Sequence, residues 1–142
     1  DPLTRRLFWE VIGDLAHEGT TVFVTTHVMD EAEHCTRLAM MHYGRLIAEG
    51  TPEQMRTEHV QTMVEVQAHP IWPVLQALEE APDVVEVALF GDAVHAELSR
   101  EAALQAAGVS FEHVEAVTPT MEDVFVSLAR QRERPTEVGS DR

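Results

Sequence analysis

The chain has 142 residues, a hydrophobic fraction of 44% and a formal net charge of −15, so it is long enough for one ordinary domain or two small ones. The acidic balance excludes nucleic acid as an expected partner, because a phosphate polyanion would be repelled. All ten basic residues are arginine, which excludes a Gly-x-x-x-x-Gly-Lys-Ser/Thr phosphate loop and lysine Schiff-base chemistry within these residues.

The first predicted element is a helix over residues 3–17. Asp1 is a typical helix cap, Pro2 suits the first helical position, and Gly19 provides a stop. Apolar residues recur on one face with helical spacing, at Leu3, Leu7, Phe8, Val11, Ile12 and Leu15. This pattern predicts an amphipathic helix.

Residues 21–25 are predicted to form a strand that is buried on both faces, because they are rich in β-branched residues and almost continuously apolar. Thr26 and His27 stand at its polar end. A helix is expected next, over residues 28–35, and the helix dipole favours negative charge in its first turns. The acidic residues there are Asp30, Glu31 and Glu33.

Two strands, over residues 38–42 and 45–49, are predicted to form a hairpin through a tight two-residue turn. A further helix begins after Thr51, and Gln54 is spaced to complete a capping box with it. We place a domain boundary near Glu58.

The second half alternates between strands and helices. The expected elements are a strand at 60–68, a helix at 70–81, strands at 84–90 and 93–98, a helix at 100–107, a strand at 111–117 and a helix from about 121 to 130. The order βαββαβ plus one helix predicts a small ferredoxin-like α+β domain over residues 59–131, with helices on one face of its sheet. Residues 132–142 are polar and are expected to be a disordered tail.

Acidic charge is concentrated in this second half. Fifteen acidic residues and five arginines follow Glu58, whereas ten acidic residues and five arginines lie in residues 1–58. The simplest interpretation is an acidic, solvated surface. No apolar run approaches the roughly 20 residues that span a bilayer, so we expect a soluble chain without direct membrane insertion.

Metal binding and thiol chemistry are not expected. The eight histidines and the single cysteine, Cys35, match no zinc-binding spacing. A lone cysteine on a helix is usually a small buried hydrophobe, and it cannot form a disulfide within the chain.

His27 is the candidate catalytic residue. A histidine at the end of a parallel strand stands where such a sheet presents its ligands, so it could contact a phosphate or a developing charge. The alternative is a structural histidine in a turn that caps the following helix.

The order of motifs over residues 1–58 resembles the end of the nucleotide-binding domain of an ABC-transporter ATPase. That family shows Gly-Leu-Asp-Pro, an amphipathic helix, a strand, Thr-His, an acidic helix, a strand and Gly-Arg/Lys-Ile-x-x-x-Gly-Thr-Pro-Glu-Glu in this order. The matching positions here are Asp1-Pro2, 3–17, 20–26, His27, 29–34, 38–42 and 44–54. The resemblance implies an α/β fragment, the end of a P-loop NTPase sheet of the RecA-like kind, followed by the α+β ferredoxin-like domain.

The resemblance also implies roles for two residues. Asp1 corresponds to the D-loop aspartate, which faces the second ATPase subunit, and His27 to the switch histidine, which contacts the γ-phosphate of ATP and orders the attacking water. Such positioning is most of what phosphoryl transfer requires of a protein. The phosphate loop, the Q-loop, the signature motif, the Walker B aspartate and the catalytic glutamate would all precede Asp1, so we expect a fragment of a longer protein.

Residues 118–128, Thr-Pro-Thr-Met-Glu-Asp-Val-Phe-Val-Ser-Leu, resemble the Pro-Ser-Leu-Glu-Asp-Val-Phe ending of the accessory domain in exporters of the drug-resistance, nodulation and daunorubicin type. The physical content of the motif is a capped helix with one apolar face. That face consists of Met121, Val124, Phe125 and Leu128.

Together these patterns predict a parent protein that hydrolyses ATP to power an ABC-2-type exporter. It would use ATP and Mg²⁺ and act as a dimer on membrane-spanning subunits, at the cytoplasmic face of the cell membrane. The chain alone is expected neither to bind ATP tightly nor to hydrolyse it. The alternative is a regulatory ligand-binding or protein-docking module without an ATPase role.

Overall fold

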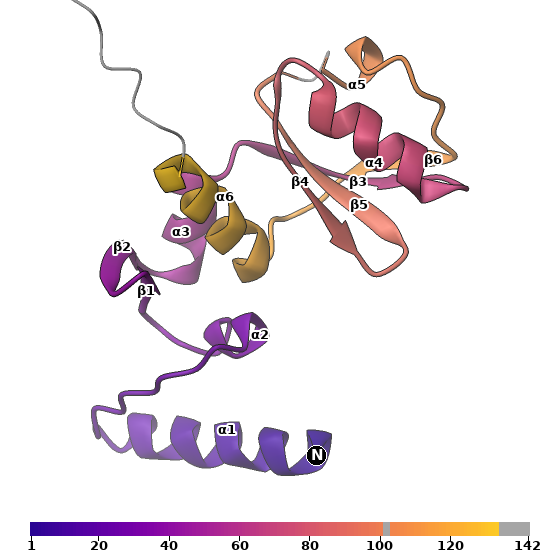
Figure 1. Cartoon of the computed structure of the whole chain (residues 1–142). Helices are drawn as coiled ribbons and strands as arrows, with labels where there is room; N and C mark the ends of the chain where they lie inside the picture. The colour runs from indigo at the N-terminus through magenta and orange to yellow at the C-terminus, as the bar shows by residue number, and fades with distance from the viewer. Residues whose placement is uncertain (101–102, 134–142) are drawn as a thin grey trace, which may run out of the picture.

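A computed structural model describes residues 1–100 and 103–133 (Figure 1). The helices are α1 (Pro2–His17), α2 (Met29–Ala32), α3 (Pro52–His59), α4 (Ile71–Glu80), α5 (Ala103–Ala106) and α6 (Met121–Glu133). The strands are β1 (Leu38–His42), β2 (Arg45–Gly50), β3 (Thr62–Gln67), β4 (Val84–Phe90), β5 (Ala93–Leu98) and β6 (His113–Ala116).

Helix α1 forms where the sequence predicts it and lies at one end of the molecule (Figure 1). Asp1 caps it, since its carboxylate accepts a hydrogen bond from the backbone N–H of Leu3 at 3.0 Å. No residue of α1 is buried, and Leu3 and Val11 are 64% and 58% exposed. Most of the apolar face of this helix is therefore open in the part of the chain that the structure describes.

The strand predicted at residues 21–25 is absent from the structure. The segment has no regular secondary structure and pairs with no strand among the described residues, and Phe23 is 88% exposed. A strand needs ladder hydrogen bonds from a neighbour, so β-branched composition alone does not create one. The following helix α2 covers only Met29–Ala32 rather than residues 28–35.

The predicted hairpin is confirmed. Strands β1 and β2 pair antiparallel, and the register joins His42 to Arg45 at the turn. Tyr43 and Gly44 both have positive φ, of 46° and 71°, as a type I′ turn requires. The capping box of α3 is also present, because Thr51 and Gln54 exchange hydrogen bonds of 2.9 and 3.1 Å.

The second sheet has the strand order β4-β5-β3-β6, and every neighbouring pair in it is antiparallel. Its strands and helices follow one another as the sequence predicts. One feature differs, since α4 and α5 pack on one face of the sheet whereas α6 contacts the other. The prediction of helices on one face holds for α4 and α5, and the additional helix α6 covers the opposite side.

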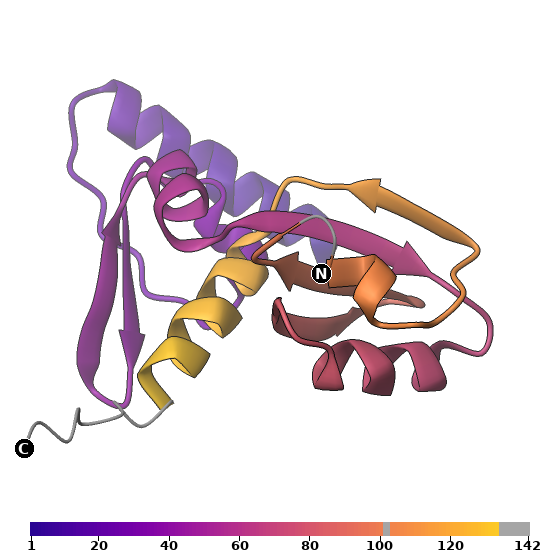
Figure 2. The same ribbon diagram turned by 90° about the horizontal axis from the view of Figure 1, so that it is seen from above.

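Two hydrophobic cores result. The first joins α2, the hairpin and α3 to α6, and its buried residues are Ala32, Met40, Ile47, Met55, Val60, Met63, Met121, Val124 and Leu128. The second lies between the four-stranded sheet, α4 and α5, and includes Val66, Leu78, Val94, Ala96 and Leu98. Figure 2 shows α6 lying between the β1–β2 hairpin and the four-stranded sheet.

Helix α6 therefore belongs to the same core as elements that lie about 60 to 90 residues earlier in the sequence. Arg56 reinforces this junction, since its Nε donates to the carbonyl of Pro119 at 2.8 Å. The domain boundary near Glu58 and the ferredoxin-like class stay predictions. The predicted tail begins within α6, at residues 132–133, and its remainder, 134–142, lies outside the described residues.

Candidate functional site

His27 lies in a bend between residues 21–25 and α2, and it is exposed. Its neighbour Thr26 fixes this bend. The hydroxyl of Thr26 accepts from the backbone N–H of Val28 at 3.0 Å and donates to the Glu31 carboxylate at 2.6 Å. Thr26 therefore fixes the bend, whereas no side chain caps the N-terminus of α2, so the capping role that the alternative interpretation gave to His27 is not seen.

The His27 ring has no hydrogen-bond or ion-pair partner among residues 1–100 and 103–133. An exposed imidazole without partners can donate a hydrogen bond to an incoming anion such as a phosphate. The structure thus leaves the His27 ring free for the predicted chemistry, and within the described part of the chain no second catalytic group is hydrogen-bonded to it.

Asp1, the other predicted site residue, is engaged in capping α1. Besides the bond from Leu3, its carboxylate accepts from the hydroxyl of Thr4 at 3.4 Å. Helix α1 is tied to the His27 region by an Arg5–Glu31 ion pair of 3.5 Å. No hydrogen bond or ion pair joins Asp1 and His27 within the described residues.

No metal centre emerges from the described residues, because no group of three or more histidine, cysteine, aspartate or glutamate side chains converges there. Cys35 is partly buried, and this burial, together with the charge of Glu31, raises the pKa of its thiol. A thiol that stays protonated is a weak nucleophile.

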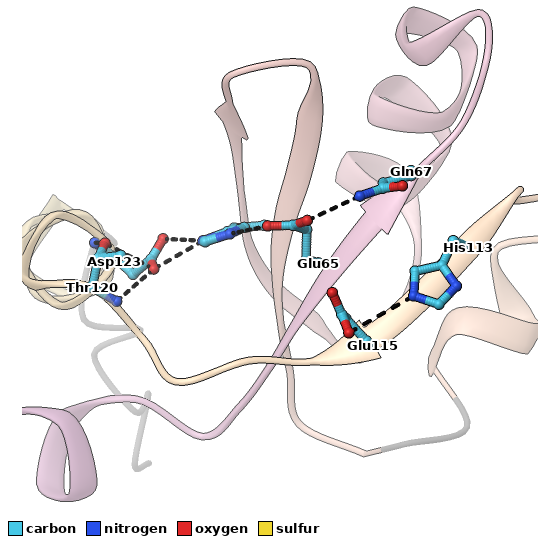
Figure 3. Close-up of polar contacts among 7 residues, drawn as sticks. Glu65, Gln67, His113, Glu115, Thr120 and Asp123 are labelled. Atoms are coloured by element: carbon cyan, nitrogen blue, oxygen red, sulfur yellow. Dashed lines mark hydrogen bonds and ion pairs between the residues drawn. The ribbon is translucent and has the colours of Figure 1, made fainter.

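The most connected polar group lies elsewhere, between α6 and the four-stranded sheet. His95 of β5 is only 4% exposed, and its Nδ1 lies 3.0 and 3.1 Å from the two carboxylate oxygens of Asp123. Its Nε2 lies 3.2 Å from Oε2 of Glu65. The ring also stacks on Phe90 with a centroid separation of 4.2 Å. Figure 3 shows the carboxylates of Glu65 and Asp123 approaching this position from opposite sides.

Asp123 has a second role at the start of α6. Its Oδ2 accepts from the backbone N–H and the hydroxyl of Thr120, at 2.8 and 2.9 Å (Figure 3). In return, the hydroxyl of Thr120 accepts from the backbone N–H of Asp123 at 3.1 Å. This reciprocal pair is a capping box with aspartate in the third position.

Further polar contacts continue this layer along α6. Glu97 is 1% exposed, and it accepts from the hydroxyl of Ser127 at 2.7 Å and from the backbone N–H of Gln61 at 2.9 Å. Arg130 lies 3.5 Å from Glu86 of β4. We refer to His95, Glu65, Asp123, Glu97, Ser127, Glu86 and Arg130 as the polar seam.

Hydrogen bonds favour the ionised form of Glu65, which lies at the exposed end of the polar seam. The bond from His95, and then that from the Gln67 amide, lower the pKa of Glu65. Glu65 is therefore ionised at neutral pH.

Sequence reasoning missed the polar seam. His95 and Glu97 alternate along β5 with Val94, Ala96 and Leu98, a pattern that normally indicates one buried and one solvated face. The available signal was the Thr-x-x-Asp spacing of residues 120–123, which predicts a capping box but not the contact with His95.

Comparisons with known proteins place these features in context. No model of a known protein family matches the chain. It is 52% identical over 58 residues to the probable multidrug ABC transporter ATP-binding protein YbhF of Escherichia coli K12, a match that covers 41% of this chain and 10% of that protein. Over 141 residues it is 33% identical to the Nod factor export ATP-binding protein I of Cupriavidus metallidurans, which covers 94% of this chain and 45% of the relative.

A similar protein from Rhizobium meliloti, also a Nod factor export ATP-binding protein I, is 34% identical over 133 residues. Its match covers 90% of this chain and 39% of the relative. The homologues of this chain are ATP-binding proteins of ABC transporters. The chain spans less than half the length of each of these three relatives. In the described ranges, every helix is too short or too polar to cross a membrane.

Proposed function

We propose that the chain is part of the ATP-hydrolysing subunit of an ABC-type exporter. The observation that carries this proposal is the similarity to Nod factor export ATP-binding proteins over at least 90% of the chain. The resemblance of the motifs around Asp1, His27 and residues 44–54 is consistent with it.

In this proposal His27 is the switch histidine. It would donate a hydrogen bond to the γ-phosphate of ATP and hold the attacking water, so that charge developing in the transition state is stabilised. Its exposure and its lack of other partners in the described part of the chain support the role, as does the bend fixed by Thr26 and Glu31. Asp1 would face the second ATPase subunit while it caps α1.

Residues 1–58 would then be the end of a P-loop nucleotide-binding domain, and residues 59–131 a ferredoxin-like accessory domain. The antiparallel order β4-β5-β3-β6 supports the second assignment. The open apolar face of α1 and the exposed Phe23 support the first, because the rest of a nucleotide-binding domain would cover them. The greater length of the relatives is consistent with such a further part.

The same assignment implies which nucleotide and which partner subunits the intact protein would bind. ATP and Mg²⁺ would bind to the intact protein, which would dimerise on membrane-spanning subunits at the cytoplasmic face of the membrane. This chain contains no lysine for a phosphate loop, so alone it would not bind ATP tightly. Micromolar Mg-ATP binding to the chain, measured by calorimetry, would contradict this part of the proposal.

The decisive experiment compares variants of the intact protein that carries these residues. His27→Ala is expected to lower kcat for ATP hydrolysis by about a hundredfold, the usual cost of removing one donor to a transition-state oxygen. His113→Ala is the matched control, because His113 is also an exposed histidine but lies on β6. Equal activity of both variants and the unmodified protein would remove His27 from the mechanism.

The docking-module alternative has weaker support. A groove of about 570 Å³ runs along β4, and its lining includes Val84, Val87, Glu79, Arg130 and Glu133. A docking site for an apolar partner would have a mainly apolar lining. The charged groups in this groove favour a solvated surface instead.

A further inference from the structure

Helix α6 is held by two chemically different surfaces. Its apolar side chains Met121, Val124 and Leu128 are buried in the first core with α3 and the hairpin. Its polar side chains meet the four-stranded sheet through the polar seam. Burial of apolar area is insensitive to pH, whereas hydrogen bonds between titratable groups are not. The two attachments of α6 therefore respond differently to a change of pH.

The contacts around His95 require one more proton than a neutral imidazole ring and two ionised carboxylates supply. Both ring nitrogens lie within 3.2 Å of carboxylate oxygens. An ionised carboxylate only accepts, and a neutral imidazole can donate from only one nitrogen. Both contacts can be hydrogen bonds only if the ring is an imidazolium or if one carboxylate is protonated.

The surroundings place this proton on the ring. Asp123 accepts two further hydrogen bonds from Thr120 on Oδ2, so its carboxylate acts as an acceptor on that side as well. Glu65 accepts from Gln67, and its pKa lies below the usual range. The face of the Phe90 ring, stacked on His95, also favours a positive charge there.

We propose that His95 is a pH-sensitive clamp. As an imidazolium it ties β5 to Asp123 at the start of α6 and to Glu65 of β3. When it loses its second proton, one of these carboxylates faces a ring nitrogen that can no longer donate. The sheet then separates from the polar side of α6, while the apolar side of α6 stays in the first core.

Other charged groups bear on the clamp. Glu86 of β4 lines the same small cavity as His95 and Asp123, and it pairs with Arg130 of α6. Glu97 follows two residues later on the same side of β5 and is bound by Ser127. The cavity has a volume of about 10 Å³, room for about one water molecule, so solvent can replace a lost contact only in part.

The sign of the pH dependence follows from these groups. A cation stabilised only in the folded state contributes stability at low pH, and this contribution is lost as the pH rises and the ring is neutralised. Glu65 acts in the opposite sense, because its lowered pKa contributes stability above the ordinary carboxyl range, which is lost as the pH falls through that lowered pKa. The clamp is therefore strongest from mildly acidic to neutral pH.

The direct test is nitrogen NMR of the histidine side chains in the unmodified 142-residue chain. At about pH 7 we expect both ring nitrogens of His95 to be protonated, and exposed His113, with one carboxylate contact at 3.8 Å, serves as the comparison in the same spectrum. A neutral His95 with a single ring proton at this pH would overturn the proposal.

A pair of variants tests the consequence for stability. His95→Gln should lower Tm by roughly 5 °C or more at about pH 6, and this loss should shrink towards about pH 9. His113→Gln, its matched control on β6, should change Tm little at either pH. A loss for His95→Gln that is the same at both pH values would contradict the clamp.

If His95→Gln does not fold, Glu65→Gln provides the same comparison at a position that is partly exposed. It should weaken the clamp with the same pH dependence towards alkaline pH, and a pH-independent effect would again contradict it. None of these measurements involves ATP, so the clamp and the proposed ATPase role can fail separately.

Discussion

Helices α1 and α6 are both amphipathic, yet the structure treats them in opposite ways. The sequence places apolar residues on one face of each, over 16 residues in α1 and 13 in α6. No residue of α1 is buried, whereas five residues of α6 are. The difference shows that helical spacing predicts a helix and its apolar face, but burial depends on whether another part of the chain supplies a complementary surface.

Helix α6 even buries polar groups. Asp123 and Ser127 lie on the side that meets the sheet, where His95 and Glu97 satisfy them. A buried polar group is tolerated when its hydrogen bonds are made. Such groups therefore restrict α6 to one position on the sheet more narrowly than apolar contacts alone.

The largest expected effect contrasts the apolar faces of the two helices. Leu128→Ala in α6 should lower the free energy of unfolding by about 3 kcal/mol, because Leu128 is 5% exposed and its loss leaves a cavity in the first core. Leu7→Ala in α1 should change it by less than about 0.5 kcal/mol, because Leu7 is 53% exposed. Urea denaturation of both variants measures the contrast. Equal losses would mean that α1 is covered in solution.

The next effect concerns the polar side of α6. Asp123→Asn removes the charge that faces His95 while keeping a similar shape, and it should lower the free energy of unfolding by about 2 kcal/mol at neutral pH. Glu122→Gln is the control, since Glu122 is the exposed neighbour in the same first turn. Thermal unfolding monitored by circular dichroism measures the stability of both variants. Equal stability of the two would mean that the Asp123 contacts contribute little to the stability of the fold.

A smaller effect is expected at the capping box of α3. Thr51→Ala removes the hydroxyl that accepts from Gln54, and the usual cost of such a loss is about 1 kcal/mol. Thr57→Ala, within the same helix, should be close to neutral, because alanine favours helix interiors and Thr57 is exposed. Should Thr57→Ala cost more than Thr51→Ala in chemical denaturation, the cap is not what stabilises α3.

The smallest effect should be at His27. His27→Gln should change the free energy of unfolding of this chain by less than about 0.5 kcal/mol, because its side chain is exposed and has no partner in the described ranges. A denaturation curve that coincides with that of the unmodified chain is the expected result. A clear loss of stability would mean that His27 has a structural role.

Local signals in the sequence were sufficient for many elements. The cap at Asp1, the two-residue turn at Tyr43 and Gly44 and the Thr51–Gln54 box all involve residues within four positions of one another, so their physics is local. The same holds for the alternation of strands and helices after residue 60, which the structure reproduces in order.

Features that depend on distant residues could not be predicted in this way. The strand expected at residues 21–25 needs a pairing partner, and none lies among the described residues. The contact between His95 and Glu65 depends on the register of β3 against β5, and that with Asp123 on the return of α6 to the sheet. The motif alone indicates His27, and its position in the fold adds only that the side chain is exposed.

The return of α6 also affects how the protein can fold during synthesis. Residues 29–63 emerge from the ribosome well before residues 121–133, yet their core contains Met121, Val124 and Leu128. Until the later segment is made, Met55 and Met63 lack part of their apolar surroundings, and nascent chains that expose such surface are prone to aggregate. All four strands of the second sheet precede α6 in the sequence, so the region translated earlier would be the one that waits for the last helix to complete its core.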